Sequence, residues 1–151
     1  METECDEQLT TLFVEHGLRC TKQRKAIYTA LTASRCHPTA DELFKQVGSG
    51  LAGISLATVY NTLEAFCAAG LIQKLRDAGN NGSARYDAHA DNHTHLRDAS
   101  TGEVADAPDD LSALILKHIP SHVIEKIRKQ TGFQVSQIQI ELIGQFSPGK
   151  A

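Results

Sequence analysis

The chain has 151 residues, of which 41% are hydrophobic and 22% charged, and its formal net charge is −3. This length and hydrophobic content suffice for one ordinary domain or two small ones. No apolar run approaches the ~20 residues that cross a bilayer, and the acidic start "METECDEQLTTL" lacks the basic-then-apolar order of a signal peptide. We therefore expect a cytoplasmic protein with no membrane partner.

Charge is distributed unevenly along the chain. Residues 1–7 carry four acidic groups, residues 8–86 carry a net charge of +4, and residues 87–151 carry −3. A mildly basic segment followed by an acidic one is compatible with a DNA-facing module joined to a cation-binding one, although charge alone proves neither. The four cysteines form no C-x-x-C pair, which excludes the common zinc-knuckle spacings and gives no disulfide framework.

Three helices are predicted at the start of the chain. The first covers residues 9–16, where apolar side chains recur at helical spacing, and the second follows Thr21, a suitable N-cap. The third begins with the capping box that Thr39 and Glu42 can form.

A fourth helix, "SLATVYNTLEAFCAAG", begins at Ser55 and ends near Gly70. Its predicted buried stripe consists of Leu56, Val59, Leu63 and Phe66. The segments "LIQKL" and "SARYDAH" then look like strands of a hairpin around the tip "DAGNNG". Successive helices followed by a hairpin predict a winged helix-turn-helix.

Polar side chains off the buried stripe of the fourth helix are candidates for DNA contact. Thr and Asn can meet base edges, Ala and the Thr methyl can touch thymine methyls, and Tyr can reach phosphate or stack. Basic side chains at the start of the second helix could contact the DNA backbone. The candidates are Lys22, Arg24, Ser55, Ala57, Thr58, Tyr60 and Asn61. On helical pattern alone, an ordinary solvated face is the alternative.

The second half predicts a mixture of strands and helices. Two short strands are expected at 93–98 and 103–106, followed by a helical stretch over 109–130 that Pro120 interrupts. The segment "QIQIEL" at 137–142 alternates between polar and apolar residues. It predicts a strand with one apolar face, formed by Ile138, Ile140 and Leu142.

Histidines and carboxylates near the middle of the chain suggest a metal site. Side chains alternate along a strand, so His93 and His95 share one face, about 7 Å apart. Asp106 can return beside them, Asp87 lies just before this segment, and His37 precedes the third helix. This nitrogen and oxygen set suits Fe²⁺, Mn²⁺ or Zn²⁺. One shared ion would tie both halves together; the alternative is a polar hairpin that happens to hold histidines.

Five segments together carry a family resemblance: "GLRCTKQRKAIYTAL", "HPTADELF", "SLATVYNTLEAFCAAGLI", "RYD" and "NHTHL". In order and spacing they resemble the ferric-uptake-regulator (Fur) superfamily, over residues 8–146. The resemblance implies a homodimeric, metal-dependent transcriptional repressor of the α+β class. A winged helix-turn-helix DNA-binding domain at 1–88 would precede a small α/β dimerisation and metal-sensing domain at 89–151. The regulatory site would be His37, Asp87, His93, His95 and Asp106, with residues 55–69 as the DNA-reading helix.

Two positions resemble the peroxide-sensing branch of that family. Asn61 follows the tyrosine where many iron-responsive members have arginine, and Asp106 replaces a glutamate ligand. The resemblance implies that bound Fe²⁺ reacts with hydrogen peroxide and that the oxidant modifies His37 or His93, whereas Mn²⁺ represses without reacting. An iron sensor, or a sensor of another metal or haem, is the alternative.

The chain departs from most relatives in lacking the two C-x-x-C pairs of a structural zinc site. Asp98 and Thr101 stand where the first pair would fall, and the chain ends "IGQFSPGKA" where the second would. We therefore expect no four-cysteine structural zinc, and a dimer that rests on apolar burial. The candidate dimer residues are Val135, Ile138, Ile140 and Leu142.

Two other classes of protein are compatible with parts of this sequence. Two histidines and a carboxylate match the facial triad of non-haem iron enzymes, but the sequence predicts too few strands for the β-barrel that usually holds it. A metal-buffering dimer without a DNA role is a further alternative. A regulator should bind an A/T-rich palindromic DNA operator as a dimer, and whether it forms tetramers is open.

Overall fold

The computed structural model describes residues 2–34, 36–75, 83–89 and 93–149. The chain folds into two units, residues 1–90 and residues 91–151, which are called the N-terminal and C-terminal units below. Among the described residues, no helix is both long enough and apolar enough to cross a membrane.

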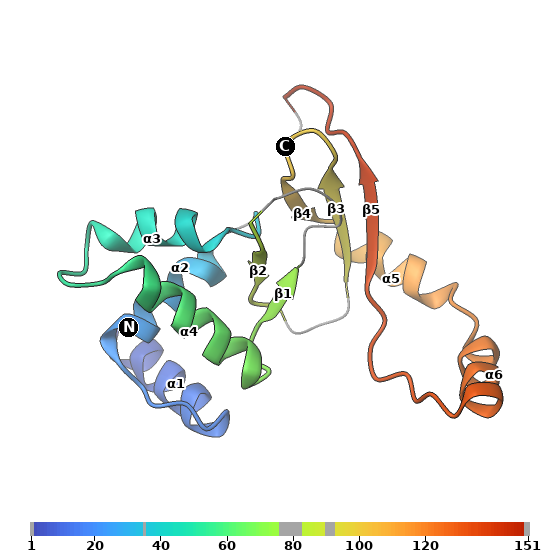
Figure 1. Ribbon diagram of the computed structural model, residues 1–151, viewed down its shortest axis with the longest axis horizontal. Coiled ribbons are helices and arrows are strands. Elements are labelled where there is room, and N and C mark those ends of the chain that lie inside the picture. The colour runs from blue at the N-terminus through green and yellow to red at the C-terminus, as the bar shows by residue number, and fades with distance from the viewer. Residues whose placement is uncertain (1, 35, 76–82, 90–92, 150–151) are drawn as a thin grey trace. The chain divides into compact units, whose positions relative to one another are not determined.

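The N-terminal unit contains the helices α1 (Glu2–Glu15), α2 (Lys22–Ala33), α3 (Ala40–Gly48) and α4 (Leu56–Ala68) (Figure 1). All three predicted N-caps are present. Thr21 and Ser55 each accept a hydrogen bond from the backbone N–H three residues later, and Thr39 and Glu42 form the capping box. Each such cap satisfies backbone donors that the first turn leaves unpaired and contributes about 1 kcal/mol.

The core of this unit forms around the apolar face of α4. Three of the four residues in the predicted stripe are fully buried, namely Val59, Leu63 and Phe66. Leu56, in the first turn of α4, is only partly buried. The ring of Phe66 stacks on Phe13 of α1 with 5.4 Å between centroids, and Tyr28 of α2 meets it edge-on at 5.9 Å. This aromatic cluster anchors α4 against α1 and α2 and leaves its opposite face exposed.

Two short antiparallel strands, β1 (Gln73–Leu75) and β2 (Arg85–Asp87), follow α4. They correspond to the predicted wing strands, whereas the predicted tip "DAGNNG" lies outside the described residues. An isolated bridge joins Thr39 to Arg85, so the residues that precede α3 lie beside β2.

The C-terminal unit is built on a three-stranded sheet in the order β4-β3-β5 (Figure 1). The strands are β3 (Thr94–Asp98), β4 (Val104–Asp106) and β5 (Ile140–Gly144). β3 pairs antiparallel with β4 and parallel with β5. Helices α5 (Asp109–Lys117) and α6 (Ser121–Thr131) separate β4 from β5. The predicted helical stretch is interrupted at Pro120 as expected, and Gly132 ends α6 with a φ of 73°.

The predicted strand at 137–142 is wrong in its position. Its pairing with β3 begins at Ile140, opposite Thr94, and continues to Gly144. Residues 137–139 lie outside the strand. Ile138 and Ile140 are partly buried, while Leu142 is 48% exposed, so the predicted apolar face is not buried within the chain. The extent of a strand is set by its partner, here the five residues of β3, and local alternation carries no record of that partner.

Candidate metal centre

In the N-terminal unit, backbone contacts hold His37 beside Asp87. The N–H of Tyr86 donates to the carbonyl of Pro38 at 3.0 Å, and the Arg85 guanidinium donates to the carbonyl of His37 at 2.9 Å. These bonds fix the segment before α3 against β2, at the end of which Asp87 lies. His37 Nδ1 is 3.5 Å from Asp87 Oδ1, and the two residues are only 3% and 0% exposed. We call His37 and Asp87 the N-terminal half-site.

His89, which the sequence left unassigned, also contacts the Asp87 carboxylate. Its backbone N–H donates to Asp87 Oδ1 at 2.8 Å, and its ring Nδ1 lies 3.3 Å from the same oxygen. An aspartate that accepts from the N–H two residues later forms an Asx-turn, a local motif that the segment Asp87-Ala88-His89 could have suggested. His89 therefore fixes the orientation of the carboxylate that faces His37.

In the C-terminal unit, strand pairing brings two histidines to one carboxylate. His95 on β3 is the register partner of Asp106 on β4. Asp106 Oδ1 lies 2.9 Å from His93 Nε2 and 3.7 Å from His95 Nε2, and the two imidazole rings are 4.4 Å apart between centroids. His95 is buried, and the Asp106 side chain is one-third exposed (33%). We call His93, His95 and Asp106 the C-terminal half-site.

Thr94, between the two histidines, ties their backbone to the start of α5. Its N–H donates to the hydroxyl of Ser112 at 3.1 Å, and its carbonyl accepts from the N–H of Ala107 at 2.8 Å. Thr94 and Ser112 are both buried. Because the N–H and the carbonyl of Thr94 are both hydrogen-bonded, the backbone between His93 and His95 is held in place and orients their imidazoles. Sequence reasoning missed Ser112, because the contact joins residues 18 positions apart and leaves no local pattern.

Both half-sites fit a divalent cation. Two donor atoms that bind one ion at about 2.1 Å lie about 3 Å apart when their bonds form a right angle, and at most about 4.2 Å apart. The imidazole–carboxylate distances of 2.9, 3.5 and 3.7 Å fall in this range. Each of the five residues offers one nitrogen or oxygen ligand atom. Imidazole and carboxylate donors suit Fe²⁺, Mn²⁺ and Zn²⁺.

The candidate DNA-contacting residues occupy different environments. Ala57 and Asn61 are exposed on α4, as is Lys22 at the start of α2. The hydroxyls of Ser55 and Thr58 are hydrogen-bonded to each other at 2.8 Å. The same Ser55 hydroxyl caps α4 by accepting from the N–H of Thr58.

Tyr60 is 38% exposed and donates its hydroxyl to Asp41 Oδ2 at 3.1 Å. Partial desolvation and this bond raise the pKa of Tyr60. Arg24 donates to the carbonyl of Arg19 at 2.9 Å, a second contact that orders a candidate side chain.

The sequence model of the ferric uptake regulator family matches residues 15–143. The chain belongs to this family. The peroxide-responsive repressor PerR of Staphylococcus aureus (strain Mu50 / ATCC 700699) is 30% identical over 145 residues, 95% of this chain and 90% of the relative. A zinc-bound manganese uptake regulator is 32% identical, with a TM-score of 0.63 over 92% of this chain and 98% of its own. The ferric uptake regulator of Pseudomonas aeruginosa with manganese is 28% identical, with a TM-score of 0.67 over 91% of this chain and 96% of its own.

Membership in the ferric uptake regulator family confirms the predicted family and fold class. The protein is a metal-responsive regulator, and its family binds DNA and acts as dimers. The fold matches structures with an N-terminal DNA-binding domain and a C-terminal dimerisation domain. A family of regulators also agrees with the prediction that the chain is not an enzyme. The domain boundary at residue 88 and the site residues stay predictions.

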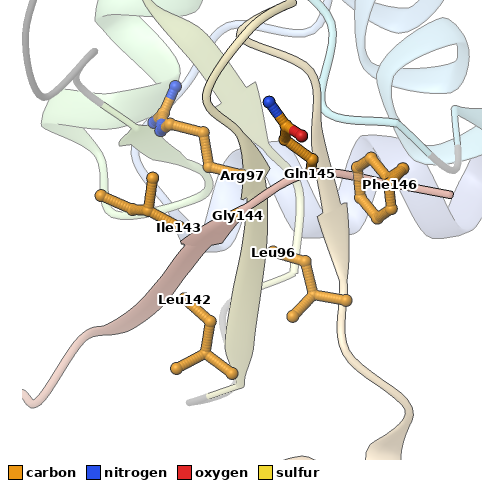
Figure 2. A pocket seen from close by; sticks show the side chains of 7 residues that line it. All are labelled: Leu96, Arg97, Leu142, Ile143, Gly144, Gln145 and Phe146. Carbon is orange, nitrogen blue, oxygen red and sulfur yellow. The ribbon is translucent and has the colours of Figure 1, made fainter.

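The C-terminal unit exposes large apolar side chains of the kind that subunits of a dimer cover. No described residue of α6 is buried. The large hydrophobic residues that this unit exposes are Leu111, Leu114, Val123, Ile127, Phe133, Leu142 and Ile143. Leu142 and Ile143 line an open hollow beside β5, where the register partners Leu96 and Leu142 extend from neighbouring strands (Figure 2). Of these residues, only Leu142 was among the predicted dimer contacts.

Proposed function

We propose that the protein is a transcriptional repressor in which one divalent cation is bound jointly by His37, Asp87, His93, His95 and Asp106. The observation that carries this proposal is that each unit places largely buried imidazoles against a carboxylate. Asp87 and His93 are six residues apart in the sequence, so the two half-sites flank the junction between the units. We place the end of the DNA-binding domain at residue 88.

The shared cation would couple metal concentration to DNA binding. An ion that is bound by ligands from both units favours the arrangement of those units in which all its ligands are within reach. If that arrangement is also the one that fits DNA, metal and DNA each raise the affinity for the other by the same factor. The protein's own contribution is to orient the ligands, through the Asx-turn of Asp87 and the bonds of Thr94.

We further propose that the signal is hydrogen peroxide and that the cation is Fe²⁺. The support is the 30% identity to a peroxide-responsive repressor and the aspartate at position 106. Fe²⁺ held by these residues would supply the redox chemistry that activates peroxide. A ring C–H of a ligand imidazole would then lose two electrons and gain one oxygen atom, and the other oxygen atom of the peroxide would leave as water. His37 and His93 are the residues expected to be oxidised. An oxidised imidazole binds metal poorly, and the coupling between the units is then lost. Mn²⁺ in the same site would support repression without this chemistry.

DNA recognition is assigned to α4 and the start of α2. Ala57, Tyr60 and Asn61 would read bases in the major groove, while Lys22 and Arg24 would contact phosphates. A two-fold dimer presents two such helices, which favours a palindromic operator. The dimer contacts we propose are Val135, Ile138, Ile140 and Leu142, together with the exposed apolar residues of α5 and α6.

The test is metal-dependent binding to DNA selected from a random-sequence library with the Mn²⁺-loaded protein. In a gel shift, the wild-type protein should bind the selected duplex with Mn²⁺ and lose binding with a chelator. His93→Ala should weaken binding more than tenfold, since even the outer partners of metal ligands contribute roughly 10–100-fold. His122→Ala, the same change at an exposed histidine of α6, serves as the control. DNA binding that ignores both metal and His93→Ala contradicts the proposal.

A second experiment separates a peroxide sensor from an iron sensor, the alternative function. The Fe²⁺-loaded protein is treated with hydrogen peroxide, and the peptides that contain His37 and His93 are examined by mass spectrometry. A peroxide sensor gains one oxygen atom on one of these peptides and loses DNA binding, while the Mn²⁺-loaded protein does neither. Unmodified peptides with intact DNA binding would indicate an iron sensor.

A further inference from the structure

Asp98, the last residue of β3, is a buried carboxylate that accepts four hydrogen bonds. Its Oδ1 accepts from the N–H groups of Ser100 at 2.8 Å and Thr101 at 3.1 Å, and from the Ser100 hydroxyl at 2.5 Å. Its Oδ2 accepts from the N–H of Phe146 at 2.9 Å. The residue is 6% exposed, a degree of burial that a charged group tolerates only when its lone pairs are satisfied.

The two oxygens of Asp98 bind two different parts of the chain. Oδ1 holds the turn that leads from β3 to β4, while Oδ2 reaches the segment that follows β5, 48 residues away in the sequence. The N–H of Ala99 adds a second bond between the same two parts, donating to the carbonyl of Gly144 at 2.8 Å. Phe146 in turn lines the hollow beside β5 (Figure 2). One carboxylate therefore joins the segments that leave β3 and β5, at the end of the sheet where both strands stop.

We propose that Asp98 is a metal-free cross-link that fixes the segment after β5 to the β3–β4 turn. The sequence places Asp98 and Thr101 where a first C-x-x-C pair would fall, and Phe146 within the stretch where a second pair would fall. Hydrogen bonds to a single carboxylate join these same two segments here. The C-terminal unit then needs neither thiolates nor a zinc ion to hold its last strand.

This cross-link separates folding from metal sensing. A structural zinc site contributes its binding free energy to folding, so chelation or oxidation of its thiolates unfolds the domain. A carboxylate bound by N–H and O–H groups is insensitive to both treatments. The hydrogen bonds also keep the Asp98 carboxylate ionised. They hold the pKa of Asp98 far below its usual range, and the largest contribution comes from the Ser100 hydroxyl, with the Phe146 N–H second. A chelator should therefore empty the regulatory site without loosening the sheet. The inference does not depend on the proposed regulatory site, since it concerns the metal-free protein.

The test measures amide hydrogen exchange at Phe146. The exchange is monitored by NMR in full-length protein that has been treated with a chelator. The wild-type amide should stay protected without metal. Asp98→Asn keeps the side-chain size but replaces one acceptor oxygen with a donor amide. Because a hydrogen bond to a charged group is lost, exchange at Phe146 should accelerate roughly tenfold or more. Ser100→Ala removes only the hydroxyl and should leave Phe146 protected. Asp110→Asn, the same change at an exposed position of α5, is the matched control.

Two results would overturn the proposal, and neither requires that a variant folds. The first is an unprotected Phe146 amide in the chelated wild-type protein. The second is a zinc ion in the purified protein whose removal unfolds the C-terminal unit. If Asp98→Asn does not fold, these wild-type measurements still decide the question.

Discussion

Replacing Ser112 by alanine should weaken the C-terminal half-site without removing a ligand. The Ser112 hydroxyl accepts from the N–H of Thr94, and both residues are buried. Alanine leaves that N–H without its acceptor, at a cost of about 1–3 kcal/mol. Alanine is also the better helix former, which returns up to about 0.5 kcal/mol in α5. The expected net loss of folding free energy is about 0.5–3 kcal/mol.

Part of this cost should appear as lost metal affinity. In the variant, the backbone at Thr94 can shift to find another partner, and the shift moves the flanking His93 and His95. Binding an ion through both imidazoles then requires the original backbone position to be restored. Since 1.4 kcal/mol corresponds to a tenfold change, the Mn²⁺ affinity should fall by up to about tenfold.

Urea unfolding of the metal-free protein measures the first quantity, and calorimetric titration with Mn²⁺ measures the second. Ser112→Thr keeps the hydroxyl and should restore affinity relative to the alanine variant. Ser121→Ala, at an exposed serine at the start of α6, should change neither quantity. The reasoning is refuted if Ser112→Ala has wild-type stability and wild-type Mn²⁺ affinity, because the hydroxyl then positions nothing.

Phe66→Ala should destabilise the N-terminal unit by about 3–5 kcal/mol, because it empties the centre of the aromatic cluster; unchanged urea unfolding of the variant would contradict this. The pKa of Asp98 is lowered by folding, so its contribution to stability is fully present above the unfolded carboxyl pKa of about 3.9 and is lost as the pH falls towards the lower folded value. Asp98→Asn should therefore flatten the loss of stability below about pH 4 in acid titrations followed by circular dichroism. Tyr60→Phe should lower DNA affinity by less than roughly tenfold in the gel shift, since the ring remains and one hydrogen-bonding group is lost; a complete loss would mean that the hydroxyl is the main contact.

The parts of the fold that the sequence predicted are those determined by neighbouring residues. Thr39 and Glu42 form their capping box within one turn, and Ser55 caps α4 through Thr58. The buried stripe of α4 could be predicted because its spacing is a property of one helix, although Leu56 lies too near the helix end to be covered fully. His95 and Asp106 could be placed together because a hairpin pairs residues that are close in the sequence.

What the sequence did not predict depends on distant partners. The range of β5 is set by β3, so the alternation from residue 137 onwards misplaced its start by three residues. Ser112 and Phe146 were not recognised, because their contacts with Thr94 and Asp98 are made by groups that any serine and any backbone amide possess. Such contacts become visible only when the fold brings the groups together.

The composition of the two half-sites explains why a shared ion is the stronger hypothesis. The N-terminal half-site offers one imidazole and one carboxylate, and the C-terminal half-site offers two imidazoles and one carboxylate. Neither reaches the five or six ligands that Fe²⁺ and Mn²⁺ commonly take, and either alone would leave a buried ion with an uncompensated positive charge. Together they would supply three nitrogen ligands and two negative charges, which match a divalent ion. The same balance would hold for Fe²⁺, Mn²⁺ and Zn²⁺. In the proposed site, the coupling between the units would therefore depend on the charge of the ion, while a response to peroxide would depend on which ion is bound.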